Sequence, residues 1–374
     1  MAADFARLVV LYSVIILLSI FFIIGGCFAK TEEDVEKELM YYGQYEMMRV
    51  LYGGKFKIGI NDIQSKTGEN PLRKAQVRPF YIDKYPVTNA QFWKFKKTKK
   101  RYQTQAELYG WSLVFKDFVP PALRNRSVPI EGEDWWLRVP GAKWSKPTGQ
   151  YSSIREQLEY PLVHVSYKDA EAFCKWKKKR LPSEKEWEFA ARGGKLGQTY
   201  PWSEHFERNR MNYWQGNFPD DNKKYDGFLG LSPVDAFPPQ NAYSMYDMLG
   251  NVWEWTASRY FDRVVDRATQ PDRMVLKGGS YIDTLHGHAN EIMRTAMRIG
   301  RGPQYTAHNV GFRCAKSAPH LLQTPDVNVP LNKKPTLDDI RDRPPKIFRK
   351  KPVADPRGSL KVEIDPRMLR KDEL

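Results

Sequence analysis

The chain of 374 residues is poor in cysteine, with only Cys27, Cys174 and Cys314, so it can form at most one disulfide. It has no Gly-x-Ser-x-Gly motif and no cysteine paired with a catalytic histidine, which argues against a serine or cysteine nucleophile. The spacing of its Asp and Asn residues is not that of an EF-hand. No internal repeat is evident. The function must therefore be inferred from other features of the sequence.

The N-terminal segment has no charge between residues 8 and 29. Such a run is typical of a signal peptide and is also long enough to span a bilayer. The small residues up to Ala29 offer a cleavage point. We interpret residues 1–29 as a signal peptide or a retained signal anchor, and 30–44 as an N-terminal extension. Either interpretation directs the chain into the secretory pathway.

The C-terminal segment, residues 319–374, has nine prolines and no Trp, Tyr or Cys, and is typical of an extended arm. It ends in an endoplasmic reticulum retrieval signal read by the KDEL receptor, formed by Lys371, Asp372, Glu373 and Leu374. Together the two ends predict the lumen of the endoplasmic reticulum, with a membrane anchor if the leader is retained.

This compartment affects how three other features are interpreted. The lumen is oxidising, which favours one disulfide among the remaining cysteines over two buried free thiols. Asn125 begins an Asn-Arg-Ser glycosylation acceptor. The net charge is +16; much of the positive charge is dispersed, and some of it lies in residues 94–101 and 175–180. In the lumen we expect no nucleic acid partner, and interpret these lysines as solvated; an acidic partner protein or an anionic membrane surface is the alternative.

Residues 45–318 are rich in aromatic residues and long enough for one large core. Helices are predicted to start after Thr88, Ser166 and Ser183, each a hydroxyl followed three residues later by a carboxyl or amide, and Gly193 is predicted to end the third. The sequence predicts an α+β domain with little regular structure and long loops. Its strand candidates are residues 78–88, 161–167, 274–281 and 310–316.

Two irregular stretches offer oxygen ligands for a hard cation such as calcium. Residues 212–228 contain Asn212 and three aspartates, and residues 246–255 contain Asp247 and Glu254 around a glycine turn. The alternatives are that the first set only forms turns and that Glu254 forms an ion pair within an aromatic core. A third cluster, Asp283, His286 and His288, could hold a transition metal, although such short clusters are more often exposed loop residues.

Several long motifs occur in one order along residues 45–318. Among them are PFYIDKYPVTNAQF, AFCKWKKKRLPSEKEWEFAARGG, NAYSMYDMLGNVWEW, KGGSY and NVGFRC. Together they resemble the formylglycine-generating enzyme, or sulfatase-modifying factor, family. The resemblance implies a C-type-lectin-like fold. It does not cover the Pro-rich tail or the retrieval signal, so the role of the tail lies outside it.

Active members of that family convert a cysteine of a nascent sulfatase to formylglycine, using oxygen and copper held by two cysteines. The resemblance places these cysteines three and eight residues after Ser280, where this chain has Asp283 and His288. Two thiolates hold Cu(I) because both are soft, which a carboxylate and an imidazole do not reproduce. No copper is therefore expected. The stretch resembles a catalytically silent second paralog within the family, which is understood to bind sulfatases and the active enzyme and to restrain sulfatase activation.

The resemblance also implies particular roles for other residues. It pairs Cys174 with Cys314, and a second family disulfide is missing because Ala191 occupies one of its positions. A substrate groove would be lined by Trp253, Ser280, Asp283, His288 and Asn309. One structural calcium would be held by the side chains of Asn212 and Asp226 and the carbonyls of Tyr213 and Phe228, and a second by Asp247, Glu254 and the carbonyls of Gly250 and Val252.

The leading hypothesis is thus a non-catalytic protein that binds sulfatases or the active enzyme in a groove. One alternative is a metal-dependent oxidase that uses Asp283, His286 and His288 in the same groove. Another is a lectin-like quality-control protein, although a fold alone supports little about function. A homodimer is compatible with the sequence but is not predicted by it.

Overall fold

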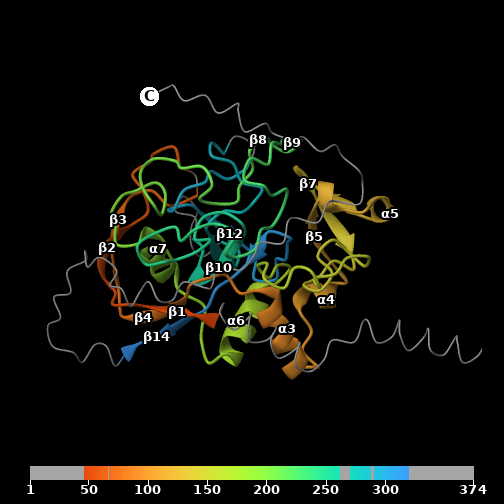
Figure 1. The fold of residues 1–374 in the computed structure, drawn as a ribbon, viewed down its shortest axis with the longest axis horizontal. Coiled ribbons are helices and arrows are strands. Elements are labelled where there is room, and N and C mark those ends of the chain that lie inside the picture. The colour runs from red at the N-terminus through yellow and green to blue at the C-terminus, as the bar shows by residue number, and fades with distance from the viewer. Residues whose placement is uncertain (1–45, 66, 262–269, 288–289, 320–374) are drawn as a thin grey trace, which may run out of the picture. The chain divides into compact units, whose positions relative to one another are not determined.

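The described part of the chain comprises residues 46–65, 67–261, 270–287 and 290–319 of a computed structural model (Figure 1). The predicted leader, the retrieval signal and His288 lie outside it. Within these ranges, no helix combines the length and the apolar character that crossing a membrane requires.

Three helices begin where capping boxes were predicted. Helix α3 (Asn89–Thr98) is capped by Thr88, α6 (Tyr167–Trp176) by Ser166, and α7 (Glu184–Arg192) by Ser183. Each cap hydroxyl accepts a hydrogen bond from the backbone N–H three residues on, and that residue's side chain bonds back to the cap. Gly193 ends α7 with φ of 56°, a conformation that favours glycine. These predictions are confirmed.

A fourth capped helix was missed. Helix α4 (Gln105–Tyr109) has a capping box between Thr104 and Glu107 and ends at Gly110 with φ of 73°. The same signal that located the other three helices is present here, but the helix has only five residues and no apolar periodicity to draw attention to it. Two shorter turns follow, η2 (Lys116–Phe118) and α5 (Pro121–Arg124).

The strands are short and form five small sheets. One sheet links the two ends of the described chain and consists of β1 (Met48–Leu51), β4 (Phe80–Asp83) and β14 (Ala315–Ser317). Two sheets lie in its first half. They are β2 (Gly54–Ile58) with β3 (Arg73–Val77), and β5 (Trp111–Phe115), β7 (Glu133–Pro140) and β6 (Val128–Ile130). The other two are β12 (Arg298–Arg301), β11 (Met274–Lys277), β10 (Trp253–Arg259) and β13 (Val310–Gly311); and β8 (Gly216–Asn217) with β9 (Asp221–Asn222). Few helices, small mixed sheets and long loops confirm the predicted α+β class.

Two of the four predicted strands need correction. Residues 161–167 form no strand, although they are apolar and β-branched. His164 has φ of 59°, which breaks an extended chain, and the backbone amides bond to loops instead, as in Leu162 N–H to the carbonyl of Val87. Residues 310–316 divide into β13 and β14, which belong to different sheets. The candidates at 78–88 and 274–281 contain β4 and β11 as predicted.

The core is built mainly from aromatic side chains. One cluster joins Phe92 and Phe95 of α3 to Phe173 of α6, and includes Trp253 and Trp255 of β10. In Figure 1, α3 and α6 lie side by side. A second cluster packs Trp187 and Phe189 of α7 against β2, β3 and β4. The core therefore fixes the first half of β10, where the candidate site begins.

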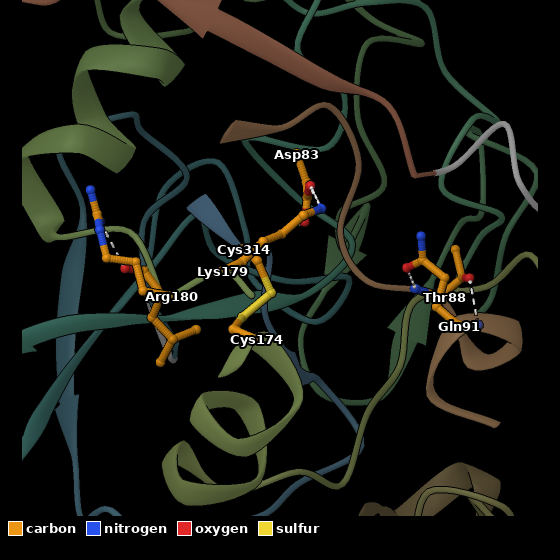
Figure 2. The surroundings of a disulfide bond; sticks show 8 residues. Asp83, Thr88, Gln91, Cys174, Lys179, Arg180 and Cys314 are labelled. Atoms are coloured by element: carbon orange, nitrogen blue, oxygen red, sulfur yellow. Dashed lines mark hydrogen bonds and ion pairs between the residues drawn. A yellow bond between two sulfur atoms is a disulfide. The ribbon is translucent and has the colours of Figure 1, made fainter. Parts of the chain in front are cut away.

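The structure contains the disulfide that the family resemblance implies. Cys174 on α6 is bonded to Cys314, 140 residues later and just before β14 (Figure 2). Both cysteines are fully buried. The backbone N–H of Cys314 donates to the carboxylate of Asp83, which Lys179 also contacts at 2.6 Å. The bond thus ties α6 to the sheet that joins the two ends of the described domain.

Candidate functional site

A tight turn after β11 forms the centre of the predicted site. The backbone N–H and the hydroxyl of Ser280 both donate to Asp283 Oδ2 at 2.7 Å, and the Asp283 N–H donates to the Ser280 carbonyl at 3.0 Å. Gly279 precedes the turn with φ of 69°, and a Cβ there would lie 2.4 Å from Met293 Sδ. The carboxylate of Asp283 therefore closes the turn.

Two further predicted groove residues converge on this turn from other strands. Asn309, just before β13, donates from Nδ2 to Ser280 Oγ at 3.0 Å. Trp253, the first residue of β10, donates its backbone N–H to the Asn309 carbonyl at 2.9 Å, and its side chain slightly lowers the pKa of the Asp283 carboxyl. The structure thus brings together the four described groove residues. The fifth, His288, lies outside the described residues.

These four side chains lie below the surface. None is more than 5% exposed. The following loop packs onto them, because the N–H of Glu291 donates to Asp283 Oδ1 at 3.3 Å and Thr284 forms a β-bridge with Ile292. In this structure they form a buried polar cluster beneath the loop. Asn309 Oδ1 is buried there without a hydrogen-bond partner among the described residues.

Burial changes the acidity of the carboxyls at this turn. It raises the pKa of Asp283 to about 6, against the opposing effect of the hydrogen bonds from Ser280. It raises the pKa of Glu291 to about 7, with a further contribution from the charge of Asp283. His286, in contrast, is exposed. No group of three His, Cys, Asp or Glu side chains within the described ranges is placed to hold a metal ion.

A buried chain of polar side chains beneath the turn was missed by the sequence reasoning. The Tyr281 hydroxyl lies 2.9 Å from His308 Nδ1, and the ring of His308 lies 5.4 Å from that of His164. His164 Nδ1 in turn lies 2.8 Å from Ser112 Oγ. Burial lowers the pKa of His308 to about 4 and that of His164 well below its usual value. No sequence pattern signals this chain, because its members come from distant segments.

The first predicted calcium set surrounds a half-buried carboxylate. Asp226 accepts hydrogen bonds from the backbone of Phe228 at 2.9 Å and of Tyr213 at 3.3 Å. Burial raises its pKa, and no ion pair to it is found among the described residues. Asn212 donates from Nδ2 to the Gly230 carbonyl at 2.7 Å, so its amide oxygen stays available as a ligand. This oxygen-rich set fits a hard cation.

The two carboxylates of the second predicted calcium set, Glu254 and Asp247, lie in different environments. Glu254 is fully buried and its carboxylate accepts from Arg313 Nε at 2.7 Å, Arg313 Nη2 at 2.6 Å and Trp187 Nε1 at 2.7 Å. This is the ion pair within an aromatic core that the sequence left open as the alternative. Because the Arg313 guanidinium already neutralises the Glu254 carboxylate, this residue does not fit the role of a calcium ligand in this structure.

Asp247 differs, because it is buried without a direct ion pair to its carboxylate among the described residues. Its Oδ2 accepts from Asn251 Nδ2 at 2.8 Å, and burial raises its pKa to about 8. Gly250, with φ of 90°, turns the chain between them and its carbonyl accepts from the Val252 N–H at 2.8 Å. Asp247 and the carbonyl of Gly250 fit a hard cation in part, without Glu254.

The predicted glycosylation acceptor is accessible. Asn125 is exposed at the end of α5, and Ser127 bonds to the carbonyl of Leu123. Its modification stays a prediction.

The chain matches the family model described as "Sulfatase-modifying factor enzyme 1-like domain" over residues 33–318. It is 51% identical over 277 residues to the "Inactive C-alpha-formylglycine-generating enzyme 2" of Bos taurus, covering 74% of this chain and 90% of the relative. It is 41% identical over 284 residues to the "Formylglycine-generating enzyme" of Thermomonospora curvata, covering 72% of this chain and 92% of the relative.

Among solved structures, PvdO from Pseudomonas aeruginosa is similar in fold, with a TM-score of 0.51 at 24% identity, over 72% of this chain and 94% of that one. At this identity the likeness supports the fold alone. The family match covers the described domain, and relatives at 51% identity carry the name of inactive enzymes. The chain therefore belongs to the formylglycine-generating enzyme, or sulfatase-modifying factor, family, and within it is a non-catalytic paralog.

Proposed function

We propose that this chain is a regulatory binding protein of the endoplasmic reticulum lumen, which associates with sulfatases and with the active formylglycine-generating enzyme and restrains sulfatase activation. The observation that carries the proposal is the state of the turn at Ser280. Ser280, Trp253 and Asn309 converge at this turn. The position implied for a copper-binding cysteine, however, is Asp283, whose carboxylate closes the turn.

The chemistry of this turn opposes copper catalysis. Cu(I) prefers soft thiolates, and Asp283 supplies a hard oxygen ligand instead. Both of its oxygens already accept hydrogen bonds from Ser280 and Glu291. A carboxylate also cannot form a disulfide or take part in thiol exchange. The side chain thus acts as a structural element of the turn.

The partner half of the proposal rests on relatedness. Relatives at 41% identity are named formylglycine-generating enzymes, and the chain covers 92% of one of them. A paralog that keeps the scaffold of an enzyme can compete for the enzyme's substrate or pair with the enzyme itself. The uncharged leader and the terminal Lys-Asp-Glu-Leu support placing this competition in the lumen, with retrieval by the KDEL receptor.

We further propose that calcium stabilises the scaffold. The half-buried carboxylate of Asp226 and the buried carboxylate of Asp247 support this proposal, because burial disfavours their ionised forms unless a cation is close. A calcium ion at these positions would supply positive charge and hold irregular loops in place. It would take no part in chemistry.

The test incubates the purified protein with a sulfatase peptide containing Cys-x-Pro-x-Arg, copper and oxygen, and follows the peptide by mass spectrometry. The active enzyme serves as the positive control. We expect unmodified peptide; formation of the aldehyde would overturn the non-catalytic half. A D283C/H288C variant is the matched comparison, and we expect it to gain Cu(I) binding measured by competition with a chelator.

A separate measurement addresses the partners. The protein is immobilised, and an unfolded sulfatase fragment or the active enzyme is passed over it. We expect at least one of them to bind and the aldehyde yield of the active enzyme to fall as this protein is added. Absence of binding to both would overturn the regulatory half and leave the non-catalytic half standing.

A further inference from the structure

Two hollows adjoin each other beside the C-terminal end of α3, on residues that the proposed function does not use. The first has a volume of about 470 Å³ and is lined by Lys96, Lys100, Lys143 and Lys146 together with Glu107. The second has a volume of about 850 Å³ and is lined by Lys99, Lys100, Arg101 and Lys175 beside Trp176. They share Lys100 and Tyr102. We name them together the cationic groove.

Tertiary structure creates this groove from two basic stretches far apart in the sequence. Residues 94–101 form the end of α3 and the turn after it, and residue 175 lies in the last turn of α6. The two helices lie side by side, so their basic ends meet (Figure 1). The loop that carries Lys143 and Lys146 adds the far wall. Positive charge from separate parts of the sequence is thereby concentrated in one concave surface.

The positive charge of the groove is largely uncompensated. Seven cationic side chains line it against one carboxylate, that of Glu107. Glu107 lies 2.7 Å from Lys96 and 3.6 Å from Lys143. Lys175 is paired with Glu171 at 3.1 Å. Among the described residues no ion pair involves Lys99, Lys100 or Arg101, and all three side chains are exposed. A concave surface of one sign concentrates its field and attracts ions of the other sign.

The identity of the cations indicates the chemistry of the ligand. Six of the seven are lysine and one is arginine. Arginine holds carboxylates and phosphates in a fixed bidentate geometry, whereas lysine is a point charge that binds an oxyanion without that geometry. Lysines spread over two adjoining hollows therefore favour a chain that carries several sulfate or phosphate groups.

The aromatic residues of the groove argue against single-stranded nucleic acid. Proteins that bind single strands present free ring faces on which bases stack. Here Trp176 packs against Phe95 and Phe173, and Tyr102 packs against Phe95 and donates its hydroxyl to Asp169. Both rings are partly buried against the core, which reduces the ring surface available for stacking. A ligand recognised by its charges alone fits better.

We propose that the cationic groove binds a sulfated polysaccharide. The sulfate groups contact Lys99, Lys100 and Arg101 in the second hollow, and Lys143 and Lys146 extend the contact into the first hollow. The site is separate from the turn at Ser280, and its occupancy does not depend on the regulatory function proposed above.

The test measures binding of a size-defined heparin octasaccharide by titration calorimetry at several salt concentrations. The K99Q/K100Q/R101Q variant should bind about tenfold more weakly and show a shallower salt dependence. The matched control is K57Q/R73Q/K74Q, which removes two exposed lysines and one exposed arginine from β2 and β3. We expect the control to change affinity by less than about twofold. The basic C-terminal tail is present in both variants, so its contribution cancels.

A second measurement localises the contact independently of affinity. Lysine-reactive labelling with mass spectrometry, with and without the octasaccharide, should show protection of Lys99, Lys100 and Lys146 but not of Lys57 or Lys74. Equal loss of affinity in the two variants, or no protection at the groove, would overturn the proposal. The competitors are desulfated heparin, polyglutamate, an oligonucleotide and anionic vesicles. If one of them binds the groove as tightly as the heparin octasaccharide or more tightly, the groove belongs to another ligand and the proposal is overturned.

Discussion

Arg313 and Glu254 form an ion pair that no solvent reaches, with Arg313 Nη2 2.6 Å from Glu254 Oε1 and Nε 2.7 Å from Oε2. The remaining Arg313 donors bond to the carbonyls of Asp83, Lys84, Tyr246 and Asp247. The pair thus connects β10, β4 and the loop at Asp247 beside the disulfide.

Removing one partner of this pair should be far more costly than removing a surface pair. In R313M the Glu254 carboxylate stays buried without its cation, and we expect the free energy of unfolding to fall by about 3–5 kcal/mol. The control is E171A, which breaks the exposed pair with Lys175 and should cost about 0.3–0.5 kcal/mol. Urea unfolding measures both. Similar losses in the two variants would contradict the assignment, and R313M/E254M should lose less than R313M.

Removing the disulfide should destabilise the domain through the unfolded chain. Cys174 and Cys314 are 140 residues apart, so the bond closes a long loop and restricts the unfolded state. We expect C174S/C314S to lose about 2–5 kcal/mol of stability. A reductant should destabilise the natural protein but leave the variant unchanged. A variant as stable as the natural protein would show that the bond contributes little.

His308 should make the protein sensitive to acid. Burial lowers its pKa to about 4, below the 6.5 of the unfolded chain, so the unfolded state binds more protons between these values. The contribution of His308 to the free energy of unfolding is therefore complete above pH 6.5. It is lost as the pH falls toward 4, and the loss is about 3 kcal/mol at most. Asp283 and Glu291 have the opposite effect on stability as the pH falls. Burial raises the pKa of each, so the folded state binds more protons than the unfolded chain and is favoured at lower pH.

Comparing variants separates these contributions. The pH dependence of unfolding is measured for H308Q and for H205Q, in which an exposed histidine is replaced. We expect H308Q to flatten the loss of stability between pH 6.5 and 4, and H205Q to follow the natural protein. Parallel profiles for all three proteins would contradict a role for His308.

Calcium should stabilise the folded chain through Asp226. A ligand that binds only the folded state at a hundred times its Kd adds about 2.7 kcal/mol. We expect calcium to raise the melting temperature more than magnesium does, because a flexible loop of carbonyls and one carboxylate suits the larger ion. D226N should reduce this shift, whereas D220N, in the same loop but exposed and paired with Lys116, should retain it. An unchanged shift in D226N would place the ion elsewhere.

Local signals in the sequence were sufficient to place the main helices. Thr88, Ser166 and Ser183 each act on the backbone within one turn, so a four-residue pattern carries the whole interaction. The apolar segment at 161–167 was mistaken for a strand because composition does not show where its amides bond. Its partners lie in loops more than 70 residues away along the chain, such as Leu162 to Val87 and His164 to Ala307.

The sequence by itself determined the family, the helix starts and the replacement of a copper ligand by Asp283, since each depends on residue identity at a fixed spacing. Only the tertiary structure decided that Glu254 pairs with Arg313, that Asp283 closes a buried turn on Ser280, which Asn309 also contacts, and that two basic helix ends meet in one groove. These outcomes depend on which distant groups share a buried volume, because a charge removed from water takes the partner that packing places beside it.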